Sequence, residues 1–267
     1  MGFLSEVVEA TRERIRRADY LTALPTDTAA SRRASLTGAI RRDRNRGALL
    51  VEYKRVSPGA DLPRLPVRTP AEFVAATAPG AVAGYSCIAT EYRFEGSVRD
   101  VAEVARATER PVLFKDFVID PIQLEAATLA GASAVLLVAR LAAEGLLELP
   151  LAELAREAHE RRLEVVLEFH HRSELKQAAG VAADVYGVNV RDLDTLRLEP
   201  DVAVATIREA NDLRPLLGLS GVASPEDARR FWDAGTDGIL VGSAAARSPD
   251  PGAFLRSLHR SSPEVSS

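Results

Sequence analysis

The sequence predicts an α/β fold, a (β/α)8 TIM barrel with an N-terminal helical extension. From Gly47 onward, short runs rich in Val, Leu and Ile alternate with longer amphipathic stretches, as in parallel strands joined by helices. Eight such units fit within the 267-residue chain, and barrels of this kind contain eight. An open doubly wound sheet is the alternative, but no G-x-G-x-x-G motif follows the first run.

Residues 1–47 form the predicted extension, which we expect to pack on the barrel. Its first part carries apolar residues at roughly helical spacing, at Phe3, Leu4, Val7, Val8 and Ile15. The extension also contains two arginine clusters, at Arg12, Arg14, Arg16 and Arg17 and at Arg41, Arg42, Arg44 and Arg46. A solvated helix face is the favoured interpretation of these arginines, and a rim that attracts an anionic substrate is the alternative.

The barrel is predicted over residues 48–260, followed by a disordered tail over 261–267. Its strands are expected at the eight apolar runs Ala48–Glu52, Val82–Ile88, Val112–Lys115, Ala134–Val138, Glu164–Glu168, Val185–Asn189, Leu216–Leu219 and Gly238–Val241. Helices are expected at Pro121–Ala130, Ala143–Arg161, Arg172–Ala179 and Pro225–Ala234. Gly131, Gly180 and Gly235 follow helical stretches, where a left-handed backbone favours glycine.

The composition excludes several classes of function. Lys and Arg number 34 against 38 Asp and Glu, so the formal charge is −4, which argues against nucleic-acid binding through net charge. No run is long and apolar enough for a membrane-spanning helix or a signal peptide, so a cytoplasmic protein is expected. The single cysteine, Cys87, cannot form an internal disulfide or a multi-thiolate zinc site, and we expect no metal.

Polar residues recur where the predicted strands end, at Glu52, Lys54, Lys115, Glu168, Asn189 and Ser220. Because strand ends meet at the mouth of a barrel, we expect these side chains to converge there. One charged residue at a strand end is weak evidence, since it is usually only solvated. Mutual repulsion and partial burial would move their pKa values toward neutrality, which suits acid–base catalysis.

Glycines follow the last two predicted strands. Gly221 comes after the seventh strand, and Gly242 with Ser243 after the eighth. Backbone N–H groups next to a helix start form a phosphate site at this place in many barrels, although Gly242 alone could be a turn glycine. Ser57, on the loop after the first strand, is a further candidate donor.

Five segments resemble the indole-3-glycerol phosphate synthase family. They are VEYKRVSPG (51–59), LFKDFVIDPIQLEAATLAGASAVLLVARL (113–141), VLEFHH (166–171), GVNVRDL (187–193) and LSGVASPEDARRFWDAGTDGILVGSAAARSPDPGAF (219–254). The most specific feature is the Lys-Asp-Phe phrase followed by an Asp-Pro-x-Gln helix start. The resemblance extends from about residue 3 to residue 258, and the extension is similar to the family's segment that covers the barrel top.

This resemblance implies a carboxy-lyase of tryptophan biosynthesis that needs no cofactor or metal. Its phosphorylated substrate would be 1-(o-carboxyphenylamino)-1-deoxyribulose 5-phosphate, which undergoes ring closure, decarboxylation and dehydration to indole-3-glycerol phosphate. By position, Lys115 matches the general acid at the carbonyl or its hydroxyl, and Lys54 matches a lysine that contacts the substrate carboxylate. The resemblance also implies that Lys54 acts as an acid, so the division of roles between Lys54 and Lys115 stays open. Glu52 and Glu168 match glutamates that steer protons.

The remaining expected roles concern binding. Asn189 matches an asparagine that orients either the substrate or the partner of Glu52, and Ser220 is included in the catalytic set. Phe94, Phe117 and Leu136 are expected to form a wall for the anthranilate ring, although each is more often simply core. Anionic groups are expected to meet Arg191, Ser57, Gly221, Gly242 and Ser243, the last three holding the phosphate.

Four positions depart from the family's usual pattern. Leu219 replaces a glutamate, Gly59 a serine and Ala89 a threonine, and Val190 stands where the family carries Asn or Ser. We expect Leu219 at the rim, where loss of a carboxylate slows the reaction or reshapes the pocket. A paralogue acting on a substituted arylamino ribulose phosphate is therefore an alternative, as is a non-catalytic phosphate-binding barrel. Binding to another enzyme of the same pathway is a further alternative that the sequence leaves open.

Overall fold

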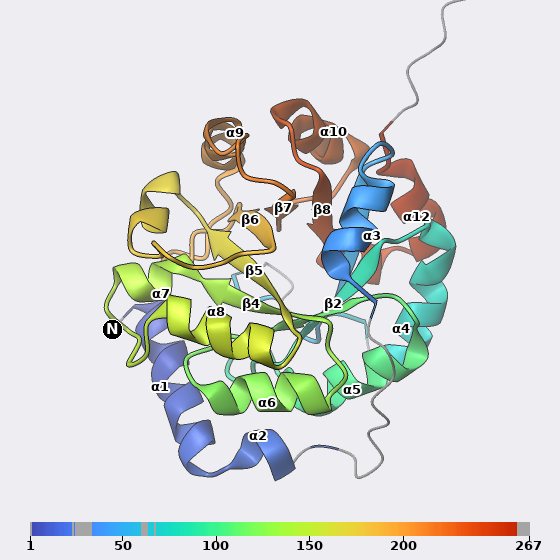
Figure 1. Ribbon diagram of the computed structural model, residues 1–267. Helices are drawn as coiled ribbons and strands as arrows, with labels where there is room; N and C mark the ends of the chain where they lie inside the picture. Colours follow the sequence, from blue (N-terminus) through green and yellow to red (C-terminus); the bar gives the residue numbers. More distant parts are fainter. Residues whose placement is uncertain (1, 23, 25–33, 60–63, 67, 261–267) are drawn as a thin grey trace, which may run out of the picture.

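The computed structural model describes residues 2–22, 24, 34–59, 64–66 and 68–260. Its strands form one closed parallel barrel in sequence order, in which each strand pairs with the next and the last pairs with the first (Figure 1). The strands are β1 Ala48–Tyr53, β2 Gly84–Ile88, β3 Val112–Lys115, β4 Ala134–Val138, β5 Glu164–Phe169, β6 Val185–Asn189, β7 Leu216–Leu219 and β8 Gly238–Val241. The predicted fold class is confirmed, and each strand boundary lies within two residues of its prediction.

Helices surround the barrel between successive strands (Figure 1). Those of the barrel are α4 Pro70–Thr77, α5 Val98–Ala107, α6 Pro121–Leu129, α7 Ala139–Ala143, α8 Leu151–Glu160, α9 Pro200–Glu209, α10 Pro225–Ala234, α11 Ser243–Arg247 and α12 Pro251–Ser257, with 3₁₀ turns η1 Ala78–Gly80 and η2 Arg172–Lys176. The start of α6 follows from its sequence, because the Asp120 side chain accepts the backbone N–H of Ile122 and the Gln123 side chain accepts the backbone N–H of Asp120. Within the described residues, no helix is long and apolar enough to cross a membrane.

Two helix predictions were wrong. Of the predicted helix over residues 143–161, only α8 Leu151–Glu160 forms, because α7 ends at Ala143, Gly145 adopts a left-handed φ of +65° and Pro150 precedes α8. The stretch from Arg172 forms only the short 3₁₀ turn η2. The left-handed glycines were predicted correctly, since Gly131, Gly180 and Gly235 all have positive φ.

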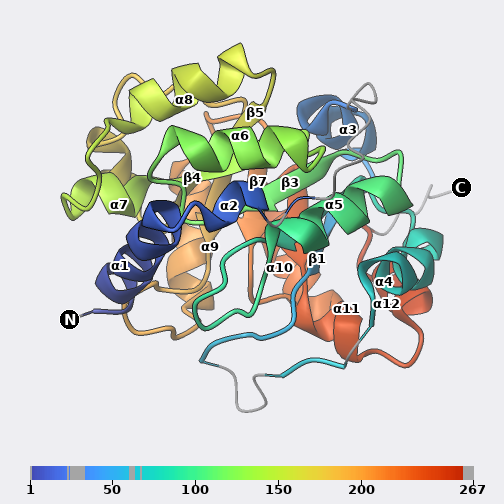
Figure 2. The same ribbon diagram turned by 90° about the horizontal axis from the view of Figure 1, so that it is seen from below.

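The described part of the N-terminal segment divides between the two ends of the barrel. Helices α1 Phe3–Arg16 and α2 Asp19–Thr22 lie at the mouth, where Arg14 donates to the backbone oxygen of Ala89 just after β2. Helix α3 Leu36–Asp43 lies at the opposite end, where Ser35 donates to Glu164 at the start of β5. Figure 2 shows α3 well apart from α1 and α2. The segment therefore covers more than the barrel top.

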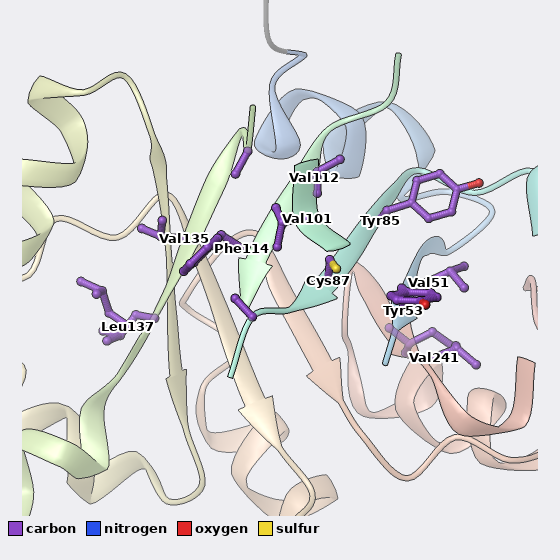
Figure 3. Packing of buried hydrophobic residues seen from close by; sticks show 14 of the residues in the cluster. Val51, Tyr53, Tyr85, Cys87, Val101, Val112, Phe114, Val135, Leu137 and Val241 are labelled. Carbon is purple, nitrogen blue, oxygen red and sulfur yellow. The ribbon is translucent and has the colours of Figure 1, made fainter. Parts of the chain in front are cut away.

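Alternate residues of each strand face opposite ways, as the pleat requires. Outward-facing side chains such as Val51, Cys87 and Phe114 pack under the helices in one apolar cluster, part of which appears in Figure 3. Inward-facing side chains such as Leu50, Leu113 and Val166 fill the barrel in a second cluster. The strand-end residues two positions further along therefore also face inward, which directs Glu52, Lys115 and Glu168 into the mouth.

Candidate active site

A cavity opens at the carboxyl ends of the strands, with a volume of about 630 Å³ including its mouth. Its size suits a small-molecule ligand. The cavity is lined by all six residues predicted as catalytic, Glu52, Lys54, Lys115, Glu168, Asn189 and Ser220. It is also lined by five of those predicted to bind substrate, Ser57, Phe94, Phe117, Leu136 and Arg191. The barrel thus brings together residues that are far apart in the sequence.

Four of these side chains form one ionic cluster. Glu52 Oε1 accepts a 2.8 Å hydrogen bond from Lys54 Nζ, and Glu52 Oε2 lies 3.7 Å from Lys115 Nζ. Lys115 Nζ lies 3.6 Å from Glu168 Oε2 on its other side. Both glutamates are buried. Lys115 therefore bridges two carboxylates supplied by different strands.

The pairing decides the protonation states. Burial of Glu52 acts to raise its pKa, but attraction to Lys54 and Lys115 outweighs burial and lowers the pKa below its ordinary value. Burial of Lys115 acts to lower its pKa, but Glu168 and Glu52 hold the pKa above its ordinary value. The expected movement toward neutrality is wrong for these two groups, because each lies beside opposite rather than like charges. Lys115 rests as an ammonium, ready to donate a proton.

Two acceptor atoms in the cluster lack a hydrogen bond. Glu52 Oε2 and Glu168 Oε2 are buried, and no donor lies within hydrogen-bond distance of either atom among the described residues. Both oxygens face Lys115 Nζ at distances that are too long for strong hydrogen bonds. A ligand hydroxyl or N–H group placed near Lys115 would satisfy these atoms.

Asn189 is fixed by contacts on three sides. Its Nδ2 donates to Glu168 Oε1 at 3.0 Å, and its Oδ1 accepts the backbone N–H of Arg191 at 3.0 Å. The buried His170 contacts the backbone oxygen of Asn189 through Nδ1 at 2.6 Å and Glu199 through Nε2 at 3.0 Å. Sequence reasoning missed His170, although it lies two residues beyond Glu168 on the same strand end.

A buried network holds the loop that follows Lys115. One oxygen of Asp116 accepts from Thr90 at 2.7 Å, and the other accepts from Tyr20 at 2.8 Å and from Gln123 at 3.0 Å. Burial, followed by the charge of Asp116, raises the pKa of Tyr20 well above its usual value. The guanidinium of Arg14 lies 4.1 Å from the centre of the Tyr20 ring. Arg14 is buried, so the solvated-face interpretation is wrong for this arginine.

An aromatic wall closes one side of the cavity. The ring centroids of Phe94 and Phe117 are 6.4 Å apart, and each lies 6.3 Å from the centroid of Phe3 in α1. Leu136 and Phe117 are buried and also line the cavity. The sequence marked Phe3 only as one apolar position of a helix, so its place in the wall became visible only in the structure.

The three residues predicted to hold the phosphate lie beside the cavity and do not line it. Gly221, Gly242 and Ser243 are absent from the lining residues. A Cβ on Gly242 would lie 3.0 Å from Lys54 Nζ and 3.1 Å from Glu52 Oε1, so the missing side chain makes room for this ion pair. Gly221 has a φ of +76°, and a Cβ there would lie 3.0 Å from Val190. A phosphate role for these three residues stays a prediction.

Leu219 does not lie at the rim. The side chain is fully buried in the inward-facing apolar cluster, and a Cβ on Gly187 would lie 2.6 Å from its Cδ1 atom. Leu219 also does not line the cavity. The expectation of a solvated rim position is wrong, because this inward-facing side chain is covered by apolar neighbours, whereas Glu52 and Lys115 at the ends of β1 and β3 line the cavity.

The other departures from the family pattern have local structural explanations. Gly59 has a φ of +78°, and a Cβ there would approach Leu196 Cβ to 2.9 Å, so glycine suits this loop. Val190 and Ala89 are both buried in the outward-facing cluster. None of these three residues lines the cavity.

A family model described as "Indole-3-glycerol phosphate synthase" matches residues 4–258. The chain belongs to the indole-3-glycerol phosphate synthase family. Family relatives include an indole-3-glycerol phosphate synthase from Methanopyrus kandleri, 35% identical over 96% of this chain and 97% of its own length. Another, from Aeropyrum pernix, is 36% identical over 81% of this chain and 82% of its own length.

Similar solved structures support the fold alone. Tryptophan synthase subunit alpha from Legionella pneumophila superposes with a TM-score of 0.58 at 15% identity, covering 84% of this chain and 96% of its own. Thiamine phosphate pyrophosphorylase from Pyrococcus furiosus gives a TM-score of 0.57 at 17% identity, covering 80% and 95%. Both share the barrel with this member of the indole-3-glycerol phosphate synthase family.

Proposed function

We propose that the chain catalyses the indole-3-glycerol phosphate synthase reaction. It would act as a carboxy-lyase in the biosynthesis of tryptophan, an aromatic amino acid. In this reaction 1-(o-carboxyphenylamino)-1-deoxyribulose 5-phosphate closes a ring and loses CO₂ and water, giving indole-3-glycerol phosphate. Family membership over residues 4–258 supports the activity. The observation that carries the proposal is the Lys115 ammonium between two buried carboxylates, beside an aromatic wall.

Lys115 is assigned as the acid at the substrate carbonyl. Ring closure converts a ketone into an alkoxide, so a nearby ammonium both donates a proton and stabilises the developing charge. Lys54 is held by a 2.8 Å hydrogen bond to Glu52, whereas the distances from Lys115 to its carboxylates are 3.6 and 3.7 Å. Lys115 is therefore the less constrained donor. Lys54 is assigned to the substrate carboxylate.

The later steps need an apolar surface and a proton acceptor. The wall of Phe94, Phe117 and Leu136 would hold the anthranilate ring and disfavour its carboxylate, which assists loss of CO₂. Dehydration removes a hydroxyl and a neighbouring proton, so it requires both an acid and a base. Lys115 and Glu168 form an acid–base pair 3.6 Å apart that suits this step, with Asn189 holding the second oxygen of Glu168.

The test is an assay of the purified protein on the arylamino ribulose phosphate, with the indole product followed by fluorescence. We expect turnover by the wild type and a loss of about 10²–10⁴-fold in kcat for Lys115→Ala. The inhibition constant for inorganic phosphate should differ only several-fold between the wild type and Lys115→Ala. The matched control is Lys176→Ala, because Lys176 is exposed and does not line the cavity.

Two results would overturn parts of this proposal. Near-normal activity of Lys115→Ala would remove the assigned acid. Absence of turnover on the parent substrate, together with turnover of a ring-substituted analogue, would favour the specialised paralogue. Burial of Leu219 away from the cavity removes pocket reshaping by that residue as a reason for this alternative. A cytoplasmic location and a pathway-enzyme partner stay predictions.

A further inference from the structure

A second cavity lies at the opposite end of the barrel, below the starts of β1, β7 and β8. Its volume is about 860 Å³ including its opening. It is lined by four arginines, Arg41, Arg44, Arg214 and Arg260, and by the single carboxylate of Asp237. The cavity is therefore strongly positive in a chain whose formal charge is −4.

The carboxylate in this cavity is already engaged. Asp237 Oδ2 accepts the backbone N–H of Leu216 at 2.9 Å and lies 3.1 Å from Arg214 Nη1. Among the described residues, Arg41, Arg44 and Arg260 form no ion pair. The neighbouring arginines differ, since Arg42 in α3 and Arg46 just after it both bind Asp43. Three guanidinium groups thus share a cavity without an anion of their own.

Two of the arginines are held in place by the protein. Arg260 donates to the backbone oxygen of Thr236 at 2.5 Å, and its guanidinium lies 5.2 Å from the centre of the Trp232 ring. Arg260 Nε is buried without a hydrogen-bond partner among the described residues. Arg214 Nη1 donates to the backbone oxygen of Gly235 at 2.5 Å. These side chains are ordered before any ligand arrives, which lowers the entropic cost of binding.

The other two arginines come from α3 and its end. Arg41 and Arg44 are three residues apart, a spacing that places side chains on the same side of a helix. Both are exposed, so they can adjust to a ligand. Guanidinium groups match phosphate oxygens with paired N–H donors, and several converging guanidiniums are typical of phosphate recognition.

We propose that this cavity binds a small phosphate-bearing anion, at a site separate from the mouth. The cavity borders the residues just before β1. Glu52 and Lys54, which line the mouth, lie at the other end of the same strand. Binding would stabilise the folded protein by RT ln(1 + c/Kd), where c is the ligand concentration, an amount that rises with concentration and with affinity. This proposal does not depend on the reaction assigned to the mouth.

The chain carries its own reporter for the test. Trp232 is the single tryptophan, and it lines this cavity. Tryptophan fluorescence would be titrated with inorganic phosphate and with pyrophosphate at constant ionic strength, and chloride would serve as the ionic control. We expect a saturable change with both phosphate probes and none with chloride.

Two double variants locate the response. Arg41→Gln with Arg44→Gln should weaken phosphate binding by about tenfold or more, because two charge-assisted contacts are lost. Arg99→Gln with Arg106→Gln removes the same charge from exposed positions on α5 and should leave binding unchanged. Melting temperatures without phosphate would show that both proteins fold.

Three outcomes would overturn the proposal. The first is an equal phosphate response in the wild type and the Arg41/Arg44 variant. The second is a response that chloride reproduces, which would indicate general screening. The third is loss of the Trp232 response in Lys54→Ala, which would place the bound phosphate at the mouth.

Discussion

At the mouth of the barrel two lysines face two buried glutamates, whereas at the opposite end four arginines share a cavity with one carboxylate. The mouth cluster is desolvated, and charges removed from water must be paired to be tolerated. Arg41 and Arg44 at the opposite end are exposed, so water can solvate them without a partner. Burial thus imposes charge balance on one end and leaves a positive excess on the other.

The comparison also separates two uses of charge. An ammonium beside carboxylates in a confined site can donate a proton to a bound molecule and accept one from it. A positive excess on an open cavity can only attract and hold an anion. Variants at one end should therefore change catalysis, and variants at the other should change stability or anion binding.

The prediction with the largest expected effect tests directly whether the two ends of the barrel have separate roles. Glu168→Gln removes a proton acceptor at the mouth without changing its shape, so kcat should fall by about 10²-fold or more. The same kind of change at the other end, Asp237→Asn, should leave kcat within about twofold and cost about 1–3 kcal/mol of unfolding free energy. Steady-state kinetics and urea unfolding check both. Equal losses of kcat in the two variants would contradict the separation.

The next prediction concerns the apolar part of the mouth end. Leu219→Ala should lower the unfolding free energy by about 2–4 kcal/mol, because it leaves a cavity inside the barrel. Leu198→Ala is the matched control, since Leu198 is 47% exposed and should change stability by less than about 0.5 kcal/mol. Urea unfolding of both variants decides the matter. A small effect for Leu219→Ala would mean that this residue is not part of the packed interior.

A smaller effect is expected from the N-terminal helices at the mouth. Tyr20→Phe removes the hydroxyl that donates to Asp116, and we expect a loss of about 1–2 kcal/mol in unfolding free energy. Tyr186→Phe is the control, because the Tyr186 hydroxyl has no hydrogen bond among the described residues. The two losses are compared by thermal unfolding. Equal losses would show that the Asp116 network contributes nothing beyond ordinary packing.

The smallest expected effect is the dependence of folding stability on pH. The pKa of Glu52 is lowered on folding, so its stabilising contribution is present above the ordinary value of 4.5 and is lost as pH falls through the folded pKa. The pKa of Lys115 is raised, so its contribution is present below the ordinary value of 10.5 and is lost as pH rises through the folded pKa. The stability difference between wild type and Glu52→Gln should therefore stay constant around neutrality and shrink in acid. Urea unfolding across pH checks this, and a difference that grows in acid would contradict it.

Much of the mouth could be predicted because a strand has a period of two. Leu50 and Leu113 face inward, so Glu52 and Lys115 must face inward as well, and parallel strands place all carboxyl ends at one end of the barrel. Leu219 follows the same periodicity, but only the structure shows that its inward-facing side chain is fully buried and does not line the cavity. Helix ends were harder to predict, because Gly145 and Pro150 interrupt a stretch whose composition is otherwise helical.

Residues that act through partners distant in sequence were not predictable. Phe3 joins the wall through Phe94 and Phe117, and His170 reaches Asn189 and Glu199, all across large sequence separations. The direction of the pKa changes at Glu52 and Lys115 likewise depends on which charges become neighbours. No local pattern records those distances.

The sequence by itself determined the order of the strands, the closed barrel and the inward direction of the charged strand ends, because apolar periodicity and turn chemistry are local properties. Only the tertiary structure decided that Lys115 lies between Glu52 and Glu168, that Leu219 belongs to the interior, and that α3 lies at the end opposite α1. These features depend on how strands and helices from distant parts of the chain meet in three dimensions, where packing and electrostatics act between neighbours in space.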